Sequence, residues 1–258
     1  MKIIYFSFSL FVSFFIMAQS YTIDTLVDKS PYFPSEIYRF PILKGDNDSI
    51  TNLVNTKIVE DYLWGDFNDD RKSVFSNIWA NENDETPMFS DLEFCVNVLN
   101  FKMYSVSLTS TGCGTYCERG TKSFNFDLKN GHKIELNQLV QSPYQKIALD
   151  YLSMRKQTKI QTALNWINDS LSVLKPDQDI TETYTQMKDM YVICLAKSTY
   201  TKLSEFEFYT TQNQIVLQSE RCFPHVIKSI DNLGTFNFRF EIAKIKKYLS
   251  NYGKEILL

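Results

Sequence analysis

Residues 122–136 read KSFNFDLKNGHKIEL, and this stretch decides the predicted fold. Polar residues alternate with Phe124, Phe126 and Leu128, which is the period of a strand with one buried face. The Asn130-Gly131 pair that follows favours a tight hairpin turn, and residues 133–136 return as the second strand. The sequence therefore predicts an antiparallel hairpin near the middle of the chain.

Similar patterns extend from this hairpin in both directions. Alternating or β-branched runs predict further strands at residues 36–43, 94–99, 102–109, 205–209, 214–219 and 235–242. Apolar residues spaced three and four apart predict helices at residues 50–62, 143–152, 158–174 and 245–249, while 179–197 fits neither period clearly. The sum is an α+β fold, an antiparallel β-sheet built from hairpins with helices packed on one face.

The N-terminus has the three parts of a secretory signal peptide. Lys2 is followed by an apolar run over Ile3–Met17 and then by the small residue Ala18, after which cleavage is expected. The run is shorter than the roughly 20 residues of a transmembrane helix. No cysteine precedes Cys95, so a lipoprotein attachment site is missing. We therefore expect a periplasmic or secreted protein.

These features divide the chain into three expected parts. Residues 1–18 form the signal peptide, residues 19–35 form a leader segment without a sustained period, and residues 36–258 form a single α+β domain. A formal net charge of −3 argues against a nucleic-acid partner, which would require a basic face. The chain has only 2 histidines, which disfavours histidine-dependent catalysis and favours binding.

Export exposes the cysteines to oxidising conditions, in which disulfides form. The sequence contains five, namely Cys95, Cys113, Cys117, Cys194 and Cys222, so at least one is free or intermolecular. A Cys113–Cys117 bridge that closes a tight loop is the first expectation. A bridge from either of these cysteines to Cys222 is the alternative. The distance between the Cα atoms in the folded protein decides between these pairings.

Two segments hold the candidate binding residues. The Gly112–Gly120 segment is expected to be a rigid loop that presents Tyr116, Glu118 and Arg119, although a simple stapled hairpin connection explains it as well. The segment after the 214–219 strand adds the remaining candidates, Arg221, Phe223 and His225. Cys222 beside His225 also fits a cysteine nucleophile, but disulfide formation works against the thiolate that it needs.

Three segments together carry a resemblance to a known family. They are YRFPILKG at residues 38–45 with the helix after it, TSTGCGTYCERG at 109–120 continuing into the central hairpin, and the aromatic-rich residues 206–242. Over roughly residues 36–250 the chain resembles the domain-of-unknown-function family found in the extracellular part of RsiV-type anti-sigma factors. The same unit resembles the N-terminal region of PdaC-type peptidoglycan deacetylases.

The resemblance implies an exported α+β domain without a cofactor or catalytic residues. It implies binding of lysozyme, as in the anti-sigma members, whereas catalysis in the deacetylases belongs to a separate domain. We therefore expect a non-enzymatic binding module of the bacterial cell envelope whose partner is a protein such as lysozyme, or cell-wall glycan. The alternatives are a small envelope hydrolase that uses paired carboxylates and a structural envelope protein.

Overall fold

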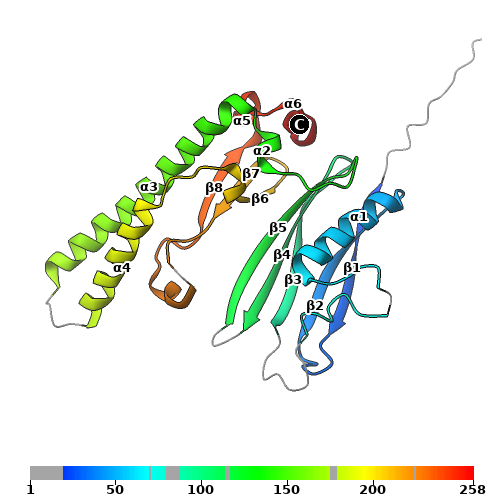
Figure 1. Ribbon diagram of the computed structural model, residues 1–258, viewed down its shortest axis with the longest axis horizontal. Helices are drawn as coiled ribbons and strands as arrows, with labels where there is room; N and C mark the ends of the chain where they lie inside the picture. Colours follow the sequence, from blue (N-terminus) through cyan, green and yellow to red (C-terminus); the bar gives the residue numbers. More distant parts are fainter. Residues whose placement is uncertain (1–19, 70, 80–87, 114–116, 175–178, 224) are drawn as a thin grey trace, which may run out of the picture.

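The computed structural model of the protein describes residues 20–69, 71–79, 88–113, 117–174, 179–223 and 225–258. Its described residues form two β-sheets with two separate hydrophobic cores. Helix α1 covers the larger sheet, and the long helices α3 and α4 lie beside the smaller one (Figure 1). The predicted α+β class is confirmed.

The larger sheet has five strands in chain order, β1-β2-β3-β4-β5. These are β1 (Tyr21–Lys29), β2 (Ile37–Gly45), β3 (Phe89–Leu99), β4 (Met103–Cys113) and β5 (Cys117–Asp127). Neighbouring strands are antiparallel except β2 and β3, which run parallel where Tyr38 lies opposite Leu92. Strand β1 corrects the expectation of a leader without regular structure. It is a largely exposed edge strand, so its sequence lacks a strict apolar alternation.

Helix α1 (Asp48–Ile58) continues as a π-helix over Val59–Leu63 and packs on this sheet. It begins where the Asn47 side chain accepts a hydrogen bond from the Ile50 N–H, an N-cap that satisfies a free backbone donor. The buried Asn55 side chain then bonds both the N–H and the carbonyl of Leu43, at 2.9 and 3.0 Å. These bonds tie α1 to strand β2.

The smaller sheet consists of β6 (Glu207–Thr210), β7 (Gln214–Ser219) and β8 (Phe236–Glu241), all antiparallel. Its helices are α2 (Leu136–Leu139), α3 (Ser142–Val173), α4 (Asp179–Ala196), α5 (Ile242–Ile245) and α6 (Asn251–Leu257). The two helices predicted after Pro143 form the single helix α3, and the ambiguous 179–197 segment is helix α4. Pro143 lies in the first turn of α3, where a missing N–H costs nothing.

The central hairpin turn is present, and its return strand is shorter than predicted. Gly131 has a φ of +75°, and the turn is closed by a 2.9 Å hydrogen bond from the Asp127 N–H to the His132 carbonyl. Only Lys133 forms a bridge, to Phe126, before α2 begins at Leu136.

The predicted loop over residues 112–120 differs more from the structure. Residues 112–113 and 117–120 belong to the paired ends of β4 and β5, where Gly112 lies opposite Glu118. Ser and Thr alternate with apolar residues along β4. The strand therefore extends to Cys113, beyond residue 109 where the predicted strand ends.

The two sheets meet where β5 passes β6. The buried Asn125 side chain donates from Nδ2 to the carbonyl of Phe208 at 2.7 Å, and the Thr210 N–H lies 3.4 Å from Ser105 Oγ. Buried polar groups that lose their partner destabilise a protein more than their net contribution suggests. The two hydrogen bonds are therefore buried polar connections between the sheets.

We expect Asn125→Ala to lower the free energy of unfolding by about 2 kcal/mol, because the Phe208 carbonyl loses its buried donor. Urea unfolding followed by far-UV circular dichroism measures the change. The control Asn137→Ala removes an exposed amide and should change stability by less than about 0.5 kcal/mol. Equal effects of the two substitutions would contradict the assigned role of Asn125.

Candidate functional site

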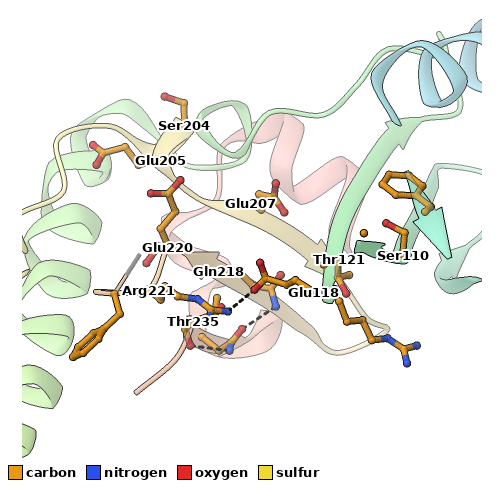
Figure 2. A pocket seen from close by; sticks show the side chains of 17 residues that line it. Ser110, Glu118, Thr121, Ser204, Glu205, Glu207, Gln218, Glu220, Arg221 and Thr235 are labelled. Atoms are coloured by element: carbon orange, nitrogen blue, oxygen red, sulfur yellow. Dashed lines mark hydrogen bonds and ion pairs between the residues drawn. The ribbon is translucent and has the colours of Figure 1, made fainter. Parts of the chain in front are cut away.

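A polar cleft of about 1200 Å³ opens between the two sheets. One wall is formed by the ends of β3, β4 and β5, and the other by one face of the smaller sheet (Figure 2). The charged residues that line it are four glutamates and two arginines, namely Glu118, Glu205, Glu207, Glu220, Arg119 and Arg221. Small-molecule sites usually measure about 300–1,000 Å³, so this cleft has room for an extended polar segment.

An ionic contact joins the two walls at the mouth of the cleft. Glu118 Oε1 on β5 lies 3.2 Å from Lys228 Nζ and 3.6 Å from an Arg221 guanidinium nitrogen. Figure 2 shows the Glu118 and Arg221 side chains reaching toward one another. All three side chains are about one-third exposed, so solvent screens the attraction. The walls are therefore linked firmly at the Asn125 junction and weakly at the mouth.

A disulfide positions Arg221. Cys222 is bonded to Cys194 of α4, with their Cα atoms 5.3 Å apart. The next residue, Phe223, is 2% exposed and its ring centroid lies 4.7 Å from that of Tyr191. The chain after β7 is thereby attached to α4 on the far side of the smaller sheet, and Arg221 is held at the cleft.

The disulfide corrects one expectation and excludes another. Cys222 bonds to Cys194, so the alternative pairing with Cys113 or Cys117 is wrong, and a Cys222 thiolate nucleophile is excluded. Cys117 is disulfide-bonded and lies opposite Cys113 in the strand register, while the Cys113 side chain lies outside the described residues. Cys95 is a free, exposed thiol, as the odd count requires.

Glutamates dominate the wall formed by the smaller sheet. Glu205 ends a short 3-10 helix before β6, Glu207 begins β6, and Glu220 follows β7. They face the same space in Figure 2, and none forms an ion pair with another described residue. The wall is therefore negatively charged toward a ligand.

The environment changes the pKa of two of these glutamates in opposite directions. Burial between the walls raises the pKa of Glu207, although its carboxylate still meets water in the cleft. Lys122 and Lys133 oppose this rise, while Glu220 adds to it. Burial also acts on Glu205, but hydrogen bonds from the backbone of Thr201 and Lys202 outweigh it and lower its pKa. Glu207 therefore keeps its proton to higher pH than Glu205.

A buried cation lies behind the acidic wall. The Lys156 side chain of α3 is packed between two rings, with Nζ 4.9 Å from the Tyr200 centroid and 5.1 Å from the Phe236 centroid. Burial lowers its pKa, and the charges of Glu205 and Glu220 counteract that shift. Lys156 does not line the cleft, so it balances part of the negative charge from inside the core.

The structure places the predicted binding residues in different environments. Glu118 and Arg221 meet across the cleft. Arg119 lies at its rim, where its guanidinium donates to Glu93 at 3.1 Å, and Phe223 packs in the core. Tyr116 lies outside the described residues. His225 begins a 3-10 helix that ends at Ile230, and its side chain also lies outside the described part.

Sequence reasoning missed the acidic wall. The sequence pattern that could have indicated this wall is the alternation Glu205-Phe206-Glu207 at the start of a strand, together with Glu220 just after the next strand. In addition, Gln218 and Asn237 lie opposite one another on β7 and β8 and join their amides at 2.9 Å on the cleft side. Within the described residues there is no cluster of side chains suited to a metal ion.

Taken together, the two-sheet fold and the polar cleft define the class as an α+β protein with an inter-sheet cleft. No family model and no curated protein sequence matches the chain. A crystal structure of a DUF3298 family member from Bacteroides fragilis has the same fold, with a TM-score of 0.53 and 11% identity. The alignment covers 93% of this chain and 97% of that one.

A DUF3298 family protein from Pseudomonas aeruginosa is also similar. Its TM-score is 0.42 at 12% identity, over 91% of this chain and 95% of the other. The Bacteroides structure supports the expectation of a domain-of-unknown-function fold. The specific relation to RsiV-type or PdaC-type proteins stays a prediction. No helix in the described ranges is long and apolar enough to cross a membrane, and a disulfide is compatible with an extracellular location.

We expect Glu207→Gln to stabilise the protein at pH 7. The folded carboxyl has a pKa above its ordinary value of 4.5, so the folded state holds the proton more tightly than the unfolded state. The free energy of unfolding of the wild type therefore falls as the pH rises from the ordinary glutamate pKa of 4.5 toward the raised pKa of the folded state. Glutamine cannot ionise. The free energies of unfolding of the variant and the wild type should therefore be equal at low pH, and the variant should become the more stable of the two as the pH rises.

Urea unfolding at a series of pH values measures this divergence. Glu182→Gln, on the exposed surface of α4, is the control and should not reproduce it. If the wild type gains stability relative to Glu207→Gln as the pH rises, the assigned environment of Glu207 is wrong.

Proposed function

We propose that the protein is a non-enzymatic binding module of the bacterial cell envelope, with the polar cleft as its binding surface. The observation that carries this proposal is the acidic wall of Glu205, Glu207 and Glu220, which has no ion-pair partner among the described residues. A negatively charged, concave surface steers and holds a cationic partner.

Lysozyme is the partner that we propose. It is a cationic protein, and the resemblance to anti-sigma ectodomains points to it independently of the charge of the cleft. The volume of about 1200 Å³ suits a protruding loop that carries Lys or Arg side chains. Such a loop could also compete with Lys228 and Arg221 for Glu118, because those two contacts are solvent-screened.

Isothermal titration calorimetry with hen egg-white lysozyme tests the proposal. We expect saturable binding that weakens as salt is added, and the double variant Glu207→Gln/Glu220→Gln should weaken it about tenfold. The control Glu182→Gln/Asp189→Asn changes net charge equally on the exposed surface of α4, away from the cleft, and should bind like the wild type.

The absence of heat at micromolar concentrations would exclude lysozyme as the partner. A parallel titration with chitohexaose examines the glycan alternative. Binding of that oligosaccharide, lost in Glu207→Gln/Glu220→Gln, would assign the cleft to cell-wall glycan instead.

Hydrolysis of a glycan is the second candidate function, and it rests on Glu207. Glycoside hydrolysis needs a carboxylic acid that stays protonated and a second carboxylate that stays ionised. The raised pKa of Glu207 suits the acid. The carboxylate of Glu205 is occupied by the Thr201 and Lys202 backbone N–H groups, so Glu220 is the carboxylate that this mechanism would use.

Release of reducing ends from purified peptidoglycan measures this activity. A hydrolase should lose about a thousandfold in rate with Glu207→Gln, which removes the transferable proton, and keep its rate with Glu182→Gln. The binding function alone predicts no release by the wild type.

A further inference from the structure

A second cavity lies on the opposite face of the smaller sheet. Side chains alternate between the faces of a strand, so Glu207 and Gln218 line the polar cleft while Leu217 points toward α3. The cavity measures about 350 Å³ and is enclosed by the first half of α3, by β7 and β8, and by the segment around α5. These elements converge in the upper part of Figure 1.

The walls of this cavity are almost entirely apolar. Tyr144, Ala148 and Tyr151 of α3 face Ile215 and Leu217 of β7 across it. Monomeric proteins close apolar gaps in their cores, because interiors are packed as densely as organic crystals. A gap of this size with an opening to solvent is therefore suited to an apolar ligand.

Two cations without a carboxylate partner among the described residues contact tyrosines that line the cavity. The Arg155 guanidinium donates to the Tyr151 hydroxyl at 2.8 Å, and Lys247 Nζ lies 4.8 Å from the Tyr248 ring centroid. Both tyrosines line the cavity, and neither cation forms an ion pair with a described residue. The nearby Lys146 and Lys244 are instead paired with Asp150 and Glu241.

We propose that this cavity binds an amphiphile with one aliphatic chain and an anionic headgroup. At about 30 Å³ for each water-sized group, the cavity holds on the order of ten methylene groups. The chain lies between α3 and β7. The charges of Arg155 and Lys247, which contact two of the lining tyrosines, attract the headgroup. A cavity of about 350 Å³ between α3, β7 and β8 favours a single soluble amphiphile over the surface of a membrane.

Calorimetry with decanoate and with 1-decanol tests both the apolar cavity and the two cations, Arg155 and Lys247. We expect decanoate to bind one to one, and 1-decanol, which lacks the charge, to bind about tenfold more weakly. Arg155→Gln/Lys247→Gln should reduce decanoate binding to the level of 1-decanol and leave 1-decanol unchanged. The matched control Lys146→Gln/Lys244→Gln should bind both probes like the wild type.

Ala148→Phe fills the cavity and should abolish binding of both probes while the thermal transition is retained. If that variant fails to fold, the charge variants decide, because their residues are at the surface. Absence of decanoate binding, equal affinity for the two probes, or an unchanged affinity in Arg155→Gln/Lys247→Gln overturns the proposal. Binding to phosphatidylglycerol vesicles without binding to decanoate also overturns it and assigns the face to a membrane.

Discussion

The hydrogen bond from the Asn125 side chain to the Phe208 carbonyl holds the edge of the larger sheet against the edge of the smaller one. The sheets share no strand, so this short stretch of β5 and β6 sets where they touch. From that point the walls of the polar cleft extend to the Cys117 end of β5 and to the residues after β7. The cleft therefore lies between this junction and the ionic contact of Glu118 at its mouth.

The two faces of the smaller sheet differ in polarity, and each face lines one of the two cavities. Its period-two alternation gives one face the glutamates and amides of the cleft and gives the other face the aromatic residues that pack on α3. Phe208, Leu217 and Phe238 form a row on the apolar face. Changes on either face can consequently alter one cavity without altering the chemistry of the other.

Much of the fold could be predicted because its strands have one buried face. The alternation over Phe124 and Phe126, and over Phe236 and Phe238, predicted β5 and β8, and all four rings are buried. Strand β1 was missed because it is an edge strand with little burial. The two-sheet division could not be predicted, since local periodicity does not show which hairpins pair with each other.

The candidate site was predictable only in part. Glu118 and Arg221 were selected for separate reasons, and their meeting depends on how the two sheets are joined. The acidic wall depends on the register that places Glu207 opposite Gln218, which no single residue specifies. The Cys194–Cys222 pair was missed for a related reason, because the helical state of residues 179–197 was ambiguous in the sequence.

That disulfide has a consequence for how the protein is produced. In a reducing cytoplasm the aromatic packing of both cores remains available, but the chain after β7 loses its covalent attachment to α4. Recombinant material prepared without oxidation would then keep its secondary structure while Arg221 leaves its place opposite Glu118. Spectroscopic signs of correct folding are therefore insufficient quality control, and a thiol assay in which Cys194 and Cys222 do not react is the appropriate criterion.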